Sequence, residues 1–123
     1  MMTENKKTLV IGASENPSRY AFIAANRLLQ YGHDIVLLGN RKGMINGHPI
    51  ETGTPPFPNV HTITLYMRAE LQKPLYQYFL ALKPKRIIFN PGTENRELEK
   101  LAEQQGIETT EACTLVMLSV GSY

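Results

Sequence analysis

Residues 9–20 read LVIGASENPSRY and are the most informative stretch of the chain. An apolar run leads into a turn at Gly12 and then into a helix start marked by Pro17 and Ser18. When a buried parallel strand ends in such a turn, the N-terminus of the following helix faces the space beside the turn. Its unpaired N–H groups and the positive end of its dipole are then directed at that space. Arg19 adds a positive charge there. The stretch predicts an anion site at a strand–helix turn. The single glycine does not meet the three-glycine dinucleotide fingerprint, so the stretch predicts no more than an anion site. The alternative is that Gly12 and Ser14 simply make a tight turn.

The length and charge of the chain narrow its class. Its 123 residues are 42% hydrophobic and contain no low-complexity tract, which predicts one domain over residues 1–123 with its own core. The 13 basic and 11 acidic residues leave a net charge of +2. A non-specific nucleic-acid binder needs a broad basic face, so we expect no nucleic-acid partner and a phosphate ligand that is held locally.

Three further features predict a cytoplasmic protein. Cys113 is the one cysteine and has no intrachain partner for a disulfide. The first seven residues, MMTENKK, lack the apolar core of a signal peptide. The apolar run at 115–118 is far too short to span a bilayer, so we expect no membrane partner.

The order of the expected elements predicts the fold class. Short runs rich in Val, Ile, Leu or Thr predict strands at 8–13, 34–39, 62–66, 86–90 and 107–110. Apolar residues at helical spacing predict helices at 19–31, in the segment ending at Leu82, and at 94–105. Strands that alternate with helices form a parallel sheet with right-handed crossovers. We therefore expect an α/β, Rossmann-like, doubly wound sheet of five parallel strands in the order 3-2-1-4-5.

The connection between the second and third strands is unusual. Residues 39–60 contain four glycines and four prolines without a helical pattern, so we expect an irregular functional loop there. NAD-binding domains have an acid at this point for the ribose hydroxyls, whereas this chain has Asn40, Arg41 and Lys42. The two cations suit a phosphate on a ribose, either the 2′-phosphate of NADP or the 3′-phosphate of coenzyme A. The alternative is a pair of solvated loop charges.

Motifs along nearly the whole chain carry a family resemblance. They are GASxxPxRY at 12–20, YGH at 31–33, NPG at 90–92 with Glu94 and Asn95, and Gly106-Ile107 before Cys113. In this order they resemble the small stand-alone CoA-binding domain family, which is similar to the CoA-binding domain in the alpha subunit of succinyl-CoA synthetase. The resemblance implies a Rossmann-like fold with coenzyme A lying across the carboxyl ends of the strands.

The resemblance also implies three groups of ligand contacts. The group at the pyrophosphate is Gly12, Ala13, Ser14, Pro17 and Arg19, with Tyr20 packed beside it. The group at the adenosine end is Asn40, Arg41 and Lys42. The group along the pantetheine arm is Asn90, Pro91 and Gly92. The chain departs from the family at one point, because relatives usually have Pro-x-Asn-Pro after the second strand and this chain has LGNRKG at 38–43.

The resemblance does not bring a catalytic group with it. The succinyl-CoA synthetases phosphorylate a histidine in a further domain, and this chain resembles the CoA half only. The other candidate groups are single residues: His33, His48, His61, Glu94, Glu111 and Cys113. None has a partner at catalytic or metal-ligand spacing, so we expect the histidines to be surface or cap residues. We therefore expect no catalytic residue and no metal site.

Three functions are compatible with these patterns. The first is a CoA-binding module that holds coenzyme A or an acyl-CoA without catalysis of its own. The second is an NADP-dependent reductase, although neither Tyr76 nor Tyr78 is followed by a lysine one turn later. The third is an interaction protein with a vestigial nucleotide cleft. The apolar run at 115–118 either packs onto the sheet or forms a dimer patch, so a homodimer or a partner enzyme stays open.

Overall fold

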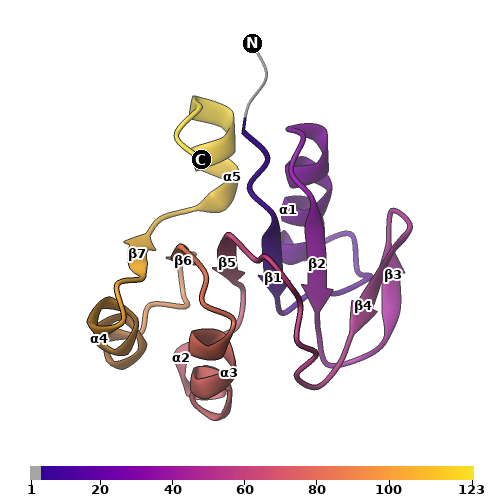
Figure 1. Cartoon of the computed structure of the whole chain (residues 1–123). Coiled ribbons are helices and arrows are strands. Elements are labelled where there is room, and N and C mark those ends of the chain that lie inside the picture. The colour runs from indigo at the N-terminus through magenta and orange to yellow at the C-terminus, as the bar shows by residue number, and fades with distance from the viewer. Residues whose placement is uncertain (1–3) are drawn as a thin grey trace.

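A sheet of seven strands runs through the computed structural model, which describes residues 4–123 (Figure 1). The strands are β1 (Thr8–Ile11), β2 (Ile35–Leu38), β3 (Gly43–Ile45), β4 (His48–Glu51), β5 (Thr62–Leu65), β6 (Arg86–Phe89) and β7 (Glu108–Glu111). Their order along the sheet is β3-β4-β2-β1-β5-β6-β7, and every neighbouring pair is parallel except β3 with β4. This confirms the expected α/β, Rossmann-like class of fold.

Helices cover both faces of the sheet (Figure 1). They are α1 (Tyr20–Gln30), α2 (Ala69–Gln72), the 3₁₀ turn η1 (Lys73–Leu75), α3 (Tyr76–Ala81), α4 (Arg96–Gln104) and α5 (Thr114–Val120). The helices α1 and α5 contact each other and share one apolar cluster with the sheet. The helices α3 and α4 contribute to a second cluster on the other face. The arrangement is doubly wound, with one layer of helices on each face.

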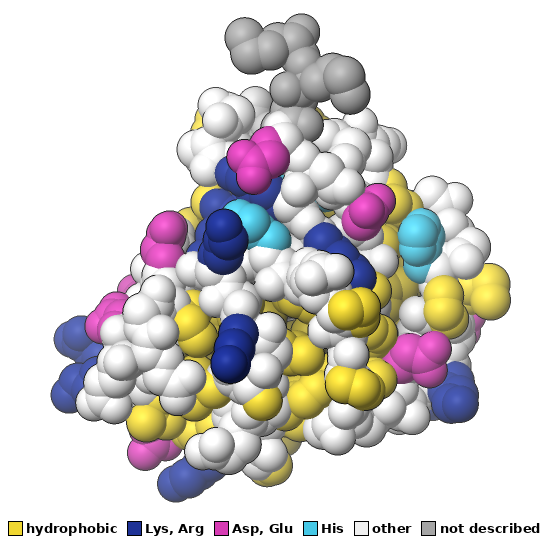
Figure 2. Space-filling view, viewed as in Figure 1, with side chains coloured by type: hydrophobic (Ala, Val, Ile, Leu, Met, Phe, Trp, Pro, Cys, Tyr) yellow, Lys and Arg dark blue, Asp and Glu magenta, His cyan; other side chains and the backbone are white. Residues whose placement is uncertain are grey.

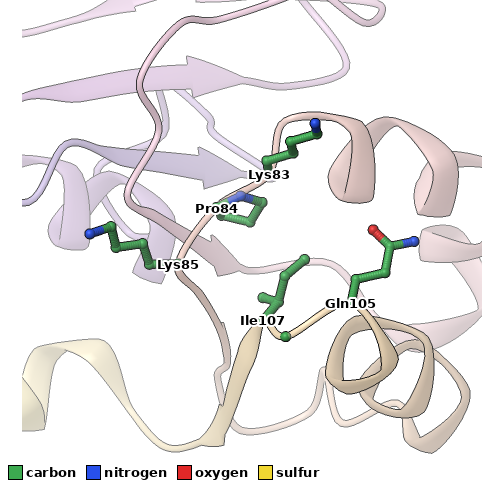
Figure 3. A pocket seen from close by; sticks show the side chains of 6 residues that line it. Lys83, Pro84, Lys85, Gln105 and Ile107 are labelled. Carbon is green, nitrogen blue, oxygen red and sulfur yellow. The ribbon is translucent and has the colours of Figure 1, made fainter.

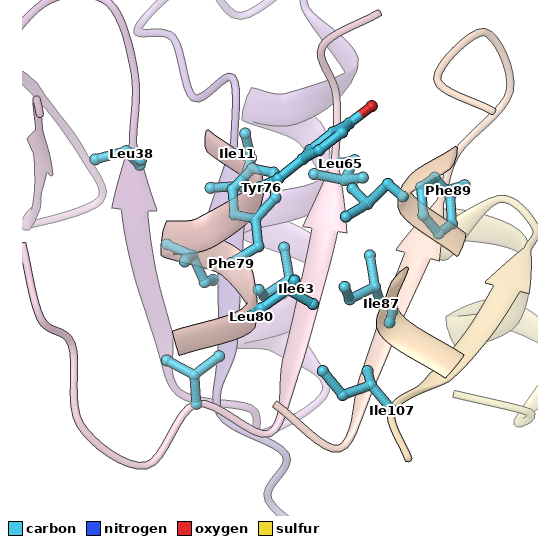
Figure 4. Close-up of a cluster of buried hydrophobic side chains, with 14 residues drawn as sticks. Ile11, Leu38, Ile63, Leu65, Tyr76, Phe79, Leu80, Ile87, Phe89 and Ile107 are labelled. Carbon is cyan, nitrogen blue, oxygen red and sulfur yellow. The ribbon is translucent and has the colours of Figure 1, made fainter. Parts of the chain in front are cut away.

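Side chains along the central strands alternate between the two faces of the sheet. Leu9 and Ile11 belong to the cluster of α3 and α4, whereas Val10 between them belongs to the cluster of α1 and α5. Figure 4 shows the first of these clusters, in which Phe79 from α3 packs near Ile63 from β5. Since both faces are covered, β1, β2 and β6 are apolar at three or four of their four positions rather than at every second one.

The expectation of five strands in the order 3-2-1-4-5 is wrong. Residues 39–60 are not irregular throughout, because they contain the hairpin of β3 and β4. The strand β4 pairs in parallel with β2, with Leu37 opposite Ile50, and so occupies the outer edge of β2. The strand β5 therefore pairs with β1 on its other side. The five expected strands thus lie in the order 2-1-3-4-5, with the hairpin beyond the second strand.

The first expected helix and the apolar run near the C-terminus can be compared directly with the structure. The helix α1 spans Tyr20–Gln30 with Arg19 as its N-cap, within one residue at each end of the helix expected at 19–31. The apolar run at 115–118 lies in α5, where Leu118 is buried beside α1 but Val116 is exposed. Among residues 4–123, no helix has both the length and the apolar character that are needed to cross a membrane.

Candidate functional site

A cleft of about 1360 Å³ opens at the carboxyl ends of β1, β2 and β5. Its walls come from the loops that follow these strands and β6, and from the first residues of α1. The chain leaves β1 toward the face of α1, whereas it leaves the neighbouring β5 toward the face of α3. The cleft therefore lies at the topological switch point, where open α/β sheets bind their ligands.

The base of the cleft is formed by a close approach of three loops at Gly12. This residue has a φ of +90°, and a β-carbon on it would lie 3.0 Å from the carbonyl oxygen of Tyr66. The amides of Gly12 and Ala13 both donate to the carbonyl of Leu38, each at 2.9 Å. The first two amides of the loop are therefore bonded to β2. Amides that donate to a ligand have to come from later residues of the loop.

The loop after Ala13 is held by its own short polar side chains. The hydroxyl of Ser14 accepts a hydrogen bond from the Asn16 amide at 3.1 Å. The side-chain oxygen of Asn16 accepts from the amide of Ser18 at 3.0 Å and from its hydroxyl at 2.8 Å. Arg19, the N-cap of α1, makes no capping bond with its side chain. The first-turn amides of α1 therefore have no capping side-chain acceptor at the mouth of the cleft.

The charged residues of the cleft are mostly cationic. Arg19, Arg41, Lys42 and Arg68 line it and are all exposed, and Glu15 is the one acid among the lining residues of the described chain. Four cations and a helix N-terminus around one cleft favour a ligand with several negative charges. On the face shown in Figure 2, by contrast, lysines and arginines lie among acidic side chains without one continuous basic patch.

Glu15 joins the loop after β1 to the edge hairpin. Its carboxylate accepts a hydrogen bond from the Met44 amide at 2.8 Å. A β-carbon on Gly43 would lie 2.5 Å from the end of the Glu15 side chain, so the glycine lets this side chain pack against the hairpin backbone in its present position. The hairpin that the sequence did not predict is thus fastened to the loop that forms the base of the cleft.

Ten of the twelve residues expected to contact a ligand line the cleft. They are Gly12, Ala13, Ser14, Arg19, Tyr20, Asn40, Arg41, Lys42, Pro91 and Gly92. Pro17 and Asn90 are not among the lining residues. The Asn90 side chain is buried and donates to Thr64 at 2.7 Å and to the Leu65 carbonyl at 2.9 Å, while it accepts from the Thr114 amide at 2.8 Å. Asn90 thus holds β5, β6 and α5 together behind the cleft.

The sequence analysis missed a second set of lining residues. It includes Glu15, Asn16, Ser18, Thr54, Tyr66, Met67, Arg68, Leu71, Leu75 and Thr93. Met67 and Arg68 directly follow the expected strand at 62–66, so the rule that ligands bind at strand carboxyl ends was a signal for them. Leu71 and Leu75 lie on α2 and η1, and their helical spacing indicated only a core-facing stripe.

Tyr66 is the titratable side chain at the base of the cleft. Burial raises the pKa of its hydroxyl well above the ordinary value of 10.0. The group is therefore a neutral phenol at physiological pH and does not act as a general base. Cys113, one of the single candidate residues, is partly buried at the N-cap of α5 and is not among the lining residues.

His33 is a cap residue, as expected, because its amide donates to the Leu28 carbonyl at 3.0 Å at the end of α1, but the expectation that it could lie at the surface is wrong. Its side chain is buried, and its Nδ1 accepts a hydrogen bond from the Lys6 amide at 3.0 Å. Its ring lies 4.9 Å from the ring of Tyr123. Burial, together with the nearby charges of Lys6 and Arg86, lowers the pKa of His33 below 6.5. The histidine is buried because the N-terminal segment and the C-terminal Tyr123 cover it, a contact that joins distant parts of the chain.

A smaller cavity of about 570 Å³ lies near the amino ends of β6 and β7. Lys83, Lys85 and Gln105 are among the residues that line it (Figure 3). The two lysine side chains point away from each other rather than toward a common ligand (Figure 3). This cavity lies at the edge of the sheet opposite to the cleft and has no convergent polar groups.

Comparisons with known proteins agree with this geometry. A family model described as "CoA binding domain" matches residues 6–119. A crystal structure of an uncharacterized protein is 47% identical, with a TM-score of 0.96 over 98% of this chain and 100% of that one. A hypothetical protein from Pyrococcus horikoshii OT3 is similar in fold, at 24% identity and a TM-score of 0.86 over 97% of this chain and 85% of that one. A structure from Thermus thermophilus is also similar in fold, at 20% identity and a TM-score of 0.79 over 97% and 91%. No curated protein matches the chain.

Proposed function

This chain belongs to the CoA-binding domain family, and we propose on that premise that it holds coenzyme A or an acyl-CoA in the cleft without catalysis of its own. The observation that carries the proposal is the arrangement of cations along the cleft. Arg19 lies at the start of α1, whereas Arg41 and Lys42 follow β2. Coenzyme A has a pyrophosphate and a separate ribose phosphate, so it needs two cationic points of this kind.

The proposed ligand lies across the strand ends. Its pyrophosphate is at the first turn of α1 beside Arg19, where the helix dipole and the positive charge both favour phosphate. Its adenosine and 3′-phosphate lie toward Arg41 and Lys42 on the β2 side. Its pantetheine arm runs the other way, toward Met67 and Pro91 in the loops after β5 and β6.

The test compares three ligands by thermal unfolding. Coenzyme A is expected to raise the melting temperature, because a ligand that binds only the native state stabilises it. Dephospho-CoA, which lacks the 3′-phosphate, is expected to raise it less, and NADP, with a 2′-phosphate, to have little effect. The double variant Arg41→Ala with Lys42→Ala should then respond equally to coenzyme A and dephospho-CoA.

The matched control is Lys83→Ala with Lys85→Ala, which also removes two exposed cations but at the opposite end of the sheet. It should keep the difference between coenzyme A and dephospho-CoA. Equal responses to the two ligands in the unmutated protein would remove Arg41 and Lys42 from the site. A larger response to NADP than to coenzyme A would favour the reductase instead.

A separate experiment tests the absence of catalysis. Incubation with acetyl-CoA or succinyl-CoA should release free thiol only at the uncatalysed rate, because among residues 4–123 no cysteine or histidine lines the cleft. Thioester cleavage that is lost in Cys113→Ser or His48→Ala would show that the protein is an enzyme.

A further inference from the structure

The side chain of Gln72 connects two of the loops that form the cleft. Gln72 lies on α2 and is completely buried. Its Nε2 donates one hydrogen bond to the carbonyl of Met67 at 2.8 Å and another to the carbonyl of Thr93 at 2.9 Å. Both N–H groups of the side-chain amide therefore donate, one to the loop after β5 and the other to the loop after β6.

The Gln72 bridge lies beyond the point where the sheet holds the two loops. The strands β5 and β6 are paired as far as Leu65 and Phe89, and the Asn90 side chain just after β6 donates to the Leu65 carbonyl. Met67 and Thr93 both line the cleft beyond these contacts. There the Gln72 side chain bridges their two backbone carbonyls and so helps to set the distance between them.

A second set of hydrogen bonds orients the Gln72 amide. Its Oε1 accepts from the Asn95 side chain at 2.9 Å, and Asn95 also donates to the Tyr76 hydroxyl at 2.8 Å. Tyr76 in turn donates to Glu97 at 3.1 Å. Because Asn95 donates to the oxygen of Gln72, the nitrogen of Gln72 has to face the two loop carbonyls.

We propose that Gln72 is a positioning residue for the pantetheine arm, because it holds Met67 and Thr93 at the separation which that arm requires. This inference rests on the proposed function and on the proposed direction of the ligand. Without the two donors, the buried carbonyls would lack partners, and the loops would move apart to reach water. The adenosine and phosphate end of the ligand lies on the other side of α1 and should not respond to such a movement.

The experiment compares coenzyme A with adenosine 3′,5′-bisphosphate, which has the ribose phosphates but no pantetheine. In Gln72→Met, which keeps the length and loses both donors, the affinity for coenzyme A should fall about tenfold or more. The affinity for the bisphosphate should stay within about twofold, since its contacts are remote from the two loops. Gln72→Glu, which places an acceptor against the two carbonyls, should show the same split.

The matched control is Tyr76→Phe. It removes a hydroxyl from the same buried network but touches neither loop carbonyl, so it should lower stability and leave both affinities within about twofold. Equal losses for the two ligands in Gln72→Met would show a general structural role and overturn the inference, while binding of the bisphosphate would still support the proposed function. If the unmutated protein binds neither ligand, the proposed function fails and the inference fails with it.

A measurement on the unmutated protein keeps the inference testable even if the Gln72 variants do not fold. The side-chain amide resonances of Gln72 should shift in an NMR titration with coenzyme A and should shift much less with the bisphosphate. Resonances that respond equally to both ligands, or to neither while coenzyme A binds, would overturn the positioning role.

Discussion

Gly39 lies so close to Ala13 that a β-carbon on Gly39 would be 2.4 Å from the Ala13 carbonyl oxygen. The Gly39 amide also donates to the Glu51 carbonyl at 2.9 Å, which fixes its backbone between β1 and β4. The glycine therefore sets how closely the loop after β2 approaches the loop after β1, and so shapes the adenosine side of the cleft.

We expect Gly39→Ala to lower the free energy of unfolding by about 1 to 3 kcal/mol, because the added methyl group meets backbone that has no free space. Urea denaturation measures this loss. Gly43→Ala is the control, since Gly43 also lacks a positive φ but its added carbon meets the end of the flexible Glu15 side chain rather than backbone. If Gly43→Ala costs as much as Gly39→Ala, the close approach to the Ala13 backbone is not the cause.

We expect Arg19→Ala to weaken coenzyme A binding by about 1.5 to 3 kcal/mol, the usual contribution of a charged hydrogen bond. The stability of the free protein should change little, because Arg19 is exposed and makes no capping bond. Calorimetric titration measures the affinity. Arg96→Ala, at the start of α4 and away from the cleft, should leave binding unchanged. A loss of stability without a loss of affinity would make Arg19 a structural residue.

The buried His33 should make stability depend on pH. Burial beside Lys6 and Arg86 lowers its pKa below 6.5, so the unfolded chain binds more protons than the folded protein between the two pKa values. The free energy of unfolding should therefore fall as the pH falls below about 6.5. His33→Asn keeps an acceptor for the Lys6 amide and should flatten this slope in thermal melts at several pH values. His48→Asn, on the edge hairpin, is the control and should retain the slope. An unchanged slope in His33→Asn would assign the dependence to other groups, such as His61.

Glu99 should have the opposite effect on the pH dependence of stability. Burial and the neighbouring Glu111 raise its pKa to about 7, so the folded protein binds more protons than the unfolded chain between pH 4.5 and about 7. Its contribution to stability is therefore present at low pH and lost as the pH rises to about 7. Glu99→Gln should raise the melting temperature at pH 8 and change it little near pH 5. Glu111→Gln removes the same repulsion and should also stabilise at pH 8. A destabilised Glu99→Gln at pH 8 would contradict this account.

The candidate site was predictable where a residue follows a strand closely or begins the helix after it. Arg41 and Lys42 come shortly after the second expected strand and Arg19 begins the helix after the first, so the general rule for α/β sheets located them at the cleft. Asn90 also follows a strand, yet its amide is turned toward Thr64 and Thr114. Position along the chain does not say which way a side chain points, because that depends on the donors and acceptors that the other elements bring near it.

Local apolar spacing, turn residues and short motifs were enough to predict the strand–turn–helix unit at 9–20, the α/β class and the family. The side of β1 on which β5 pairs became visible in the folded protein. There β4 pairs with the outer edge of β2, with Leu37 opposite Ile50, and β5 pairs with the free edge of β1. The hydrogen bonds from Gln72 to Met67 and Thr93 could not be predicted from the sequence either. Local patterns report the conformation of a segment, whereas its neighbours are selected by long-range pairing and burial.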